Sequence, residues 1–216
     1  MSGDVANSRS PARRLPIEYA VVLAGLVGLF CLLFGATFHA GFSVMEEYRI
    51  VNDSQRPLRW WLAIMIDEDI LAFGRVRPVY FFFHFGEILL LGASPHALHL
   101  ATTGLGVLTC FLFYGSARGA AADILSALVF ILLFAVTGDQ STIWYRIFSP
   151  AETFGMLLTA VAVWALVRTA ARAEPSSWNA AALVAMALAG LTKESFILII
   201  PALLLLPRRS YSAGAR

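Results

Sequence analysis

The ionisable side chains of this chain lie between its long apolar stretches and not within them. Ten of the fourteen Asp and Glu residues fall in segments that alternating membrane spans would place on one side, beginning with Glu46 and Glu47. A charge in hydrocarbon is costly, and a transporter is expected to carry charges near the middle of the membrane. The distribution therefore disfavours a transporter and predicts chemistry at a membrane surface.

The charged groups on that side come from loops that are far apart in the sequence. They are Glu46–Glu47, Asp53, Asp67–Glu68–Asp69, Arg75, Arg77, Arg146, Glu152, Lys193 and Glu194. Carboxylates can serve as a general base or hold a divalent metal, and Arg and Lys can hold a phosphate. A site with both types at the lipid boundary suits a phosphate-bearing lipid. The spacing of these residues does not identify a metal. The alternative to a binding site is that each loop charge is simply solvated.

The composition predicts an all-α polytopic membrane protein. The chain has 216 residues, of which 59% are hydrophobic and 14% charged, with a mean hydropathy of +0.74. We expect a disordered cytoplasmic tail over residues 1–16, one membrane domain over 17–207 and a second tail over 208–216. About six spans are predicted, at residues 17–38, 97–115, 121–138, 150–168, 179–192 and 195–206. The net charge of +2 is too weak to indicate a nucleic-acid partner.

Two segments leave alternatives open. Residues 78–91 lie within the first outer loop, 39–96, and are short for a span, so we expect a helix in the membrane interface. If this segment spanned instead, the later loops would change sides. The last two apolar runs meet at Lys193–Glu194, and we prefer a hairpin of two thin spans to one span with a re-entrant piece.

Charge asymmetry supports the interfacial assignment with a cytoplasmic N-terminus. The inner segments then hold nine arginines against four acids, and the outer segments hold seven cations against ten acids. An excess of Arg and Lys in short cytoplasmic loops is the usual arrangement in membranes.

Four pieces of the sequence, in order, resemble one enzyme family. They are the acidic pair in FSVMEEY, the stretch GRVRPVYFFFHFGEILLLGASPHALHL, the stretch WYRIFSPAETFGMLL and the stretch AGLTKESFILIIPALLLL. Together they resemble the membrane-embedded C-type glycosyltransferases that use polyprenyl-phosphate sugars. That group includes the protein O-mannosyltransferases and the aminoarabinose transferase of lipid A. The resemblance covers about residues 17–206.

The resemblance implies transfer of a sugar from a polyprenyl phosphate to an acceptor hydroxyl at the outer face of a bacterial inner membrane. It assigns the role of base or metal ligand to Glu46 or Glu47. It also implies substrate contacts from His99, which heads the second span, and from Glu152 and Glu194. The cations available to stabilise the departing phosphate are Arg75, Arg77, Arg146 and Lys193.

The sequence also departs from the family pattern. The acidic pair usually contains Asp, which leaves room for a shifted base such as Asp53. Family enzymes usually carry more spans, so we expect an N-terminal portion of such an enzyme. The rival from another class is a non-catalytic or truncated membrane protein of the same fold that binds a lipid or a partner.

The topology can be tested with reporter fusions. Fusions at Arg118 and Arg172 should report the cytoplasm, and fusions near Asp53 and Asp139 should report the outside, because of the charge asymmetry. An exchange of sides between Arg118 and Asp139 would mean that residues 78–91 span the bilayer.

Overall fold

The computed structural model describes residues 11–39, 41–42, 45–137, 150–170 and 177–201, and every regular element in these ranges is helical. The elements are α1 (Pro11–Phe34), a 3₁₀ turn η1 (Gly35–His39), α2 (Met45–Ser54), α3 (Leu58–Ile64), a π-helical segment η2 (Met65–Ala72), α4 (Pro78–Leu91), α5 (Pro95–Gly119), α6 (Ile124–Val136), α8 (Pro150–Ala170), α9 (Ser177–Gly190) and a 3₁₀ segment η3 (Glu194–Ile199).

Three of the described helical segments are long and apolar enough to cross a membrane. They are Pro16–His39, Pro95–Gly119 and Ala151–Thr169. Helices α4, α6 and α9 are also apolar but have only 13 or 14 residues, and about 20 are needed to cross the hydrocarbon core. Length and composition indicate an integral membrane protein.

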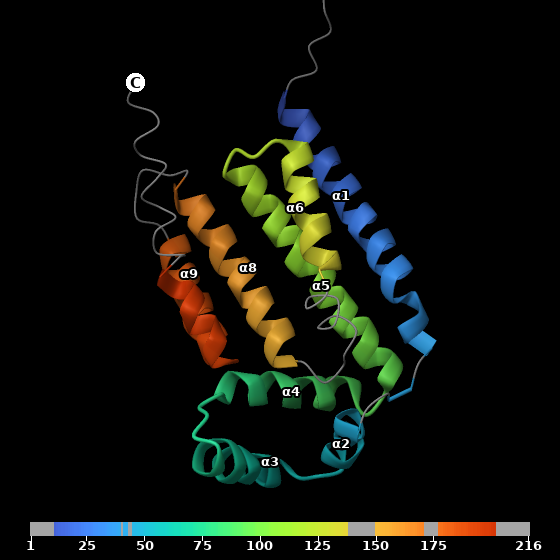
Figure 1. The fold of residues 1–216 in the computed structure, drawn as a ribbon, viewed down its shortest axis with the longest axis vertical. Helices are drawn as coiled ribbons and strands as arrows, with labels where there is room; N and C mark the ends of the chain where they lie inside the picture. The colour runs from blue at the N-terminus through green and yellow to red at the C-terminus, as the bar shows by residue number, and fades with distance from the viewer. Residues whose placement is uncertain (1–10, 40, 43–44, 138–149, 171–176, 202–216) are drawn as a thin grey trace, which may run out of the picture.

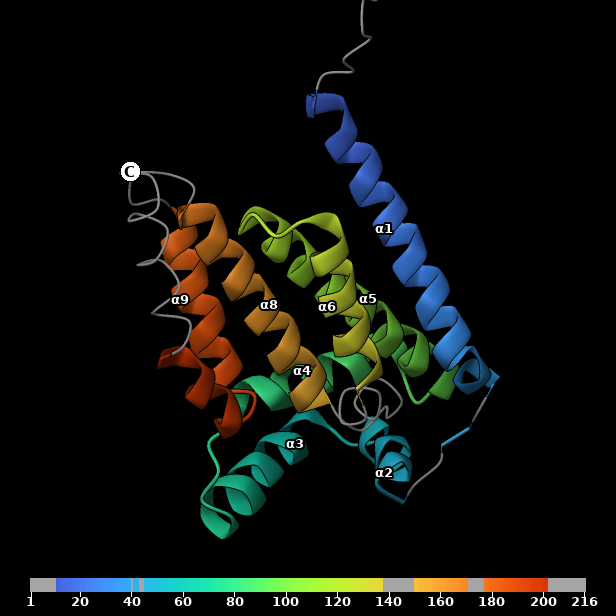
Figure 2. The same ribbon diagram turned by 45° about the horizontal axis from the view of Figure 1, so that its top comes forward.

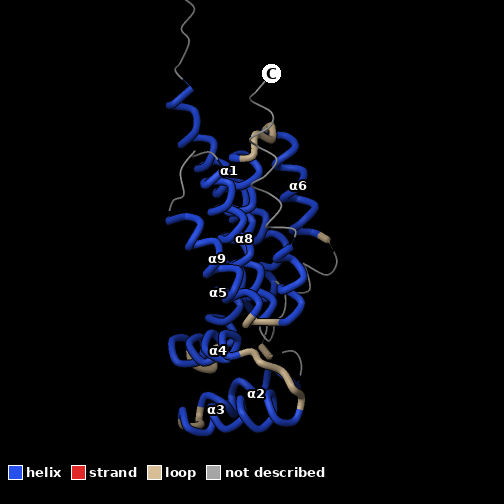
Figure 3. Tube along the Cα trace, turned by 90° about the vertical axis from the view of Figure 1, so that its left-hand side faces the viewer, coloured by secondary structure: helices blue, strands red, loops and turns tan. Residues whose placement is uncertain are grey.

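The helices form an upright bundle with a layer of shorter helices across one end. Helices α1, α5, α6, α8 and α9 run along the long axis, whereas α4 lies across their lower ends with α2 and α3 beneath it (Figure 1). The tilted and side views agree (Figures 2 and 3). The crosswise helices α2, α3 and α4 are called the end layer below.

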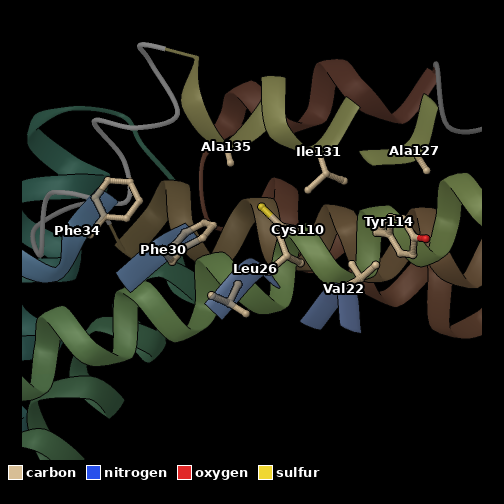
Figure 4. Close-up of a cluster of buried hydrophobic side chains, with 10 residues drawn as sticks. Val22, Leu26, Phe30, Phe34, Cys110, Tyr114, Ala127, Ile131 and Ala135 are labelled. Carbon is tan, nitrogen blue, oxygen red and sulfur yellow. The ribbon is translucent and has the colours of Figure 1, made fainter. Parts of the chain in front are cut away.

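Helix α5 is the centre of the bundle because it contacts α1, α6 and α8. Its junction with α1 and α6 is a core in which every fourth residue is buried: Val22, Leu26, Phe30 and Phe34 on α1, and Ala127, Ile131 and Ala135 on α6 (Figure 4). This spacing places one stripe of each helix inward. The opposite stripe stays apolar and exposed, as for Leu32 at 83% and Leu133 at 58%. Such a stripe matches hydrocarbon better than water.

Four hydroxyl groups within the long helices bond to the backbone of their own helix. Thr109, Ser116, Thr159 and Thr169 each donate to the carbonyl oxygen four residues earlier, at 2.8–3.0 Å. A hydroxyl bonded in this way leaves no unpaired donor in an apolar setting.

Alanine and glycine bring the last helices together. The α8–α9 interface buries Ala162, Ala165, Ala182 and Ala185 around Met186, and small residues of this kind let helix backbones approach closely. Segment η3 then folds back against α9, and the ring of Phe196 lies directly over Gly155 of α8.

The helix bounds can be compared with the sequence predictions. Helix α4 spans the predicted 78–91, begins with Pro78 and ends at Gly92, whose φ of +64° suits glycine. Helix α1 begins at Pro11, earlier than the predicted 17, and η3 begins at the predicted break after Lys193. The predicted tail 208–216 and residues 202–206 of the last predicted span lie outside the described residues.

The contact between Gly155 and Phe196 yields a stability prediction. A Cβ on Gly155 would overlap the Phe196 ring, so Gly155→Ala should displace η3 and lower the free energy of unfolding by about 1–3 kcal/mol. A lower melting temperature in detergent would show this loss. The matched control is Gly104→Ala on α5, where a Cβ meets nothing within 4 Å. Equal melting temperatures for the two variants would contradict the packing of η3 on α8.

Candidate functional site

A chain of ion pairs joins four separate segments at the end of the bundle covered by the end layer. Arg77 Nη2 donates to Asp69 Oδ1 at 2.9 Å, and Arg77 Nε lies 3.9 Å from Glu194 Oε1. The neighbour of Glu194, Lys193, donates through Nζ to Glu152 Oε1. These five residues, Asp69, Arg77, Glu152, Lys193 and Glu194, are called the polar cluster. It brings three carboxylates and two cations together.

Local structure positions Arg77 within the polar cluster. The chain leaves η2 through Gly74, whose φ of +63° needs a glycine, and Arg75 N donates to Asp69 O at 2.7 Å. Arg77 is then the residue that precedes the first turn of α4, with Pro78 next. The guanidinium also lies over the Tyr80 ring, 5.4 Å from its centre. Arg77 is therefore held by Asp69, Glu194 and the Tyr80 ring.

The other half of the polar cluster sits where α8 begins and α9 ends. Glu152 lies in the first turn of α8, where a carboxylate also complements the positive end of the helix dipole. Lys193 has extended backbone angles between α9 and η3, which directs Glu194 into the first turn of η3. Phe83 of α4 stacks on Phe154 of α8, with ring centres 4.0 Å apart. That stack holds α4 against the start of α8.

Solvent access changes along the polar cluster. The side chains of Asp69 and Arg77 are only 10% and 15% exposed, whereas those of Lys193 and Glu194 are 37% and 51% exposed. Among the described residues, the buried Asp69 Oδ2 has no hydrogen-bond partner. A ligand would therefore meet Lys193 and Glu194 first and Arg77 behind them.

A second pair lies beside the polar cluster in the end layer. His84 of α4 and Asp53 of α2 are both buried, with Nε2 and Oδ2 4.0 Å apart. Tyr80 stacks parallel to His84 at 5.6 Å between ring centres and so connects this pair to Arg77. Asp53 is thus a buried, partnered carboxylate and not a solvated loop charge.

The structure brings together some of the residues predicted from the sequence. Arg77, Glu152, Lys193 and Glu194 meet in the polar cluster. Arg75 is exposed, with its guanidinium 5.4 Å from the centre of the Phe73 ring, and lies outside the cluster. His99 is buried on α5 and is not a member of the cluster either.

The remaining predicted residues lie outside what the structure describes. The side chains of Glu46 and Glu47 and the whole of Arg146 belong to this group. The helix that carries Glu46 and Glu47 is α2, which packs against α4 at the same end of the bundle as the polar cluster.

Asp69 is the site residue that sequence reasoning missed. The acidic run Asp67–Glu68–Asp69 reads as a solvated surface, but in the structure Asp67 and Glu68 are exposed while Asp69 is 7% exposed. The π-helical turn of η2 directs Asp69 inward. A possible signal was the position of Asp69 eight residues before Arg77, with Gly74 between them to reverse the chain.

No group of three His, Cys, Asp or Glu side chains with metal-binding geometry occurs among the described residues. Within that part of the chain, the carboxylates of the polar cluster are instead paired with Arg77 and Lys193. The side chains of Glu46 and Glu47, which the sequence suggests as metal ligands, lie outside the described residues.

Glu87 adds an unusual protonation state to the end layer. It lies one turn after His84 on α4, and burial raises the pKa of its carboxyl from an ordinary 4.5 to about 7. With this pKa, the carboxyl is partly protonated near neutral pH.

The fold and the polar cluster define an all-helical integral membrane protein with paired charges at one end of its bundle. Comparison of the sequence and structure with protein families, curated proteins and solved structures found no match.

Glu87 makes stability depend on pH. A raised folded-state pKa means that the folded protein holds the proton more tightly than the unfolded chain. This contribution is fully present below about pH 4.5 and is lost as the pH rises through about 7. Melting curves from pH 5 to 8 should show wild type losing stability relative to Glu87→Gln. Parallel profiles for the two proteins would contradict the burial of this carboxyl.

Proposed function

We propose that this protein transfers a sugar from a polyprenyl-phosphate donor to an acceptor hydroxyl at the bundle end that carries the end layer. The observation that carries the proposal is the polar cluster, in which two cations and three carboxylates from four segments meet beside a helix lying across the bundle. Charged groups at this end of the bundle suit the phosphate of a lipid whose hydrocarbon chain lies among the helices.

The cations of the polar cluster are suited to the donor phosphate. Arg77 presents a planar guanidinium fixed by Asp69, and Lys193 is a more exposed point charge. In this proposal Lys193 shifts from Glu152 to the phosphate when the donor binds. Both cations then stabilise the negative charge that develops on the departing phosphate.

A carboxylate of the end layer completes the chemistry. The acceptor hydroxyl oxygen attacks the anomeric carbon, and the bond from that carbon to the phosphate oxygen breaks. The phosphate leaves with the bonding electrons, and the carboxylate takes the hydroxyl proton. The resemblance assigns this role to Glu46 or Glu47, on α2. Asp53, buried against His84, is the alternative base.

The proposal includes a particular placement in the membrane. Six spans cross a bacterial inner membrane, the N-terminus is cytoplasmic and the end layer lies at the outer interface. A metal ion is compatible with the acidic pair, and no step above requires one.

One observation favours a second candidate function. Arg77 is mostly buried and already engaged by Asp69, Glu194 and Tyr80, an arrangement that would also serve as a structural clamp. A protein with such a clamp would be a non-catalytic membrane protein that binds a lipid or a partner.

The test uses the purified protein in lipid nanodiscs with a panel of polyprenyl-phosphate monosaccharides carrying labelled sugar. Glu46→Gln or Glu47→Gln should lower the transfer rate by about 10²–10⁴-fold, because an amide cannot accept a proton. Lys193→Ala should weaken donor binding by about tenfold or more, since it removes a charged contact to phosphate.

Asp67→Asn and Glu68→Gln are the matched controls, because both residues are exposed on η2 and should leave the rate unchanged. Full activity of both folded Glu variants would refute the assignment of the base. Donor binding without transfer in the wild type would favour the non-catalytic candidate.

A further inference from the structure

A pocket lies at the end of the bundle opposite the polar cluster. It has a volume of about 290 Å³ and is lined by Tyr19 of α1, by Gly115, Arg118 and Gly119 of α5, and by Trp164 and Arg168 of α8. These residues come from the first half of α1 and from the last parts of α5 and α8, and the start of α1 and the ends of α5 and α8 lie at the top in Figure 1. The pocket shares no residue with the polar cluster.

Two glycines leave the floor of the pocket bare. A Cβ on Gly119 would lie 2.6 Å from Val167 Cγ1, so the position has no room for a side chain. A Cβ on Gly115 would lie 3.6 Å from Trp164 Nε1 and 3.7 Å from Tyr19 Cε1. The indole nitrogen of Trp164 therefore lies beside Gly115 in the lining of the pocket.

One arginine of the pocket is held rigidly. Arg118 Nε donates to Glu18 Oε1 at 2.6 Å, Arg118 Nη2 donates to Glu18 Oε2 at 3.2 Å, and Arg118 Nη1 donates to Ala122 O at 2.7 Å. The Tyr114 hydroxyl also donates to Glu18, at 2.6 Å. Glu18 balances the charge of Arg118 and fixes its orientation.

The other arginine supplies the excess positive charge. Arg168 is exposed, and its guanidinium lies over the Trp164 ring at 4.9 Å from the centre. Stacking fixes the plane of the guanidinium and leaves its N–H edge open, which suits paired hydrogen bonds to a phosphate. The cation, the indole N–H and the bare backbone converge on one volume.

We propose that this pocket binds the phosphate of an anionic phospholipid, with Arg168 as the principal cation, Arg118 behind it and Trp164 as a neutral donor. This site goes beyond the proposed function because it lies at the other end of the bundle and needs no sugar transfer.

The setting favours a lipid headgroup over a free phosphate. The pocket lies at the ends of two apolar segments, Pro16–His39 and Pro95–Gly119, where headgroups would meet the protein. Leu23, one turn after Tyr19 on the same face of α1, is 40% exposed, so an acyl chain has an apolar surface beside the pocket. A soluble phosphate would gain nothing from that surface.

The experiment measures retention of dioleoylphosphatidylglycerol by the purified protein with native mass spectrometry. Arg168→Gln should lower the affinity for this lipid by about tenfold or more, because it removes a charged hydrogen-bond donor. Gly115→Val should lower it similarly by filling the pocket without changing any charge.

The matched control is Arg56→Gln. Arg56 is also an exposed arginine stacked on a tryptophan, 5.2 Å from the centre of the Trp60 ring, but it lies in the end layer. This control should keep the lipid affinity of the wild type. An equal loss in Arg56→Gln and Arg168→Gln would show general charge attraction and overturn the proposal.

Competition with inorganic phosphate distinguishes a lipid headgroup from a soluble phosphate as the ligand of the pocket. Millimolar phosphate should leave the bound lipid in place. Displacement of the lipid by phosphate, with the same sensitivity to Arg168→Gln, would assign the pocket to a soluble anion and overturn the lipid assignment. Unchanged lipid affinity in Gly115→Val and Arg168→Gln, with both variants folded, would overturn the site itself.

Discussion

The cost of an unpaired polar group in hydrocarbon explains where the described charged side chains of this protein lie. Inside the long helices, hydroxyl groups bond to their own backbone, as Thr109 and Thr159 do. The charged side chains that the structure describes are found toward the ends of the bundle, where they are paired or reach water. The apolar helices therefore act as a scaffold whose two ends carry the polar chemistry.

The two ends of the bundle accommodate their charged side chains in different ways. The polar cluster beside the end layer pairs carboxylates with cations, so that Arg77 and Lys193 each have an acidic partner. The opposite end fixes one arginine with Glu18 and leaves Arg168 open above a tryptophan. One end therefore pairs its cations with carboxylates, and the other leaves a guanidinium exposed over an indole ring.

Much of the fold could be predicted from the sequence because its local signals are strong. Pro78 and Gly92 mark the ends of α4, and apolar runs mark α1, α5 and α8. The alternation of spans predicted that four of the site residues would lie at one end of the bundle: Arg77, Glu152, Lys193 and Glu194. Their pairing could not be predicted, since it depends on how η2 and η3 turn. Asp69 was included among the outer-side charges but was not assigned to the site, because the sequence does not show which residue of the acidic run the π-helical segment buries.

The polar cluster also has a consequence for the order of assembly. It joins Asp69 and Arg77, made early, to Lys193 and Glu194, made more than a hundred residues later. Until the ribosome has delivered that distant turn, Arg77 lacks Glu194, and α4 lacks the Phe154 ring until α8 has been made. Contacts so far apart in sequence form slowly. The contacts of the end layer with α8 and η3 can therefore be completed only once the chain has reached the turn between α9 and η3.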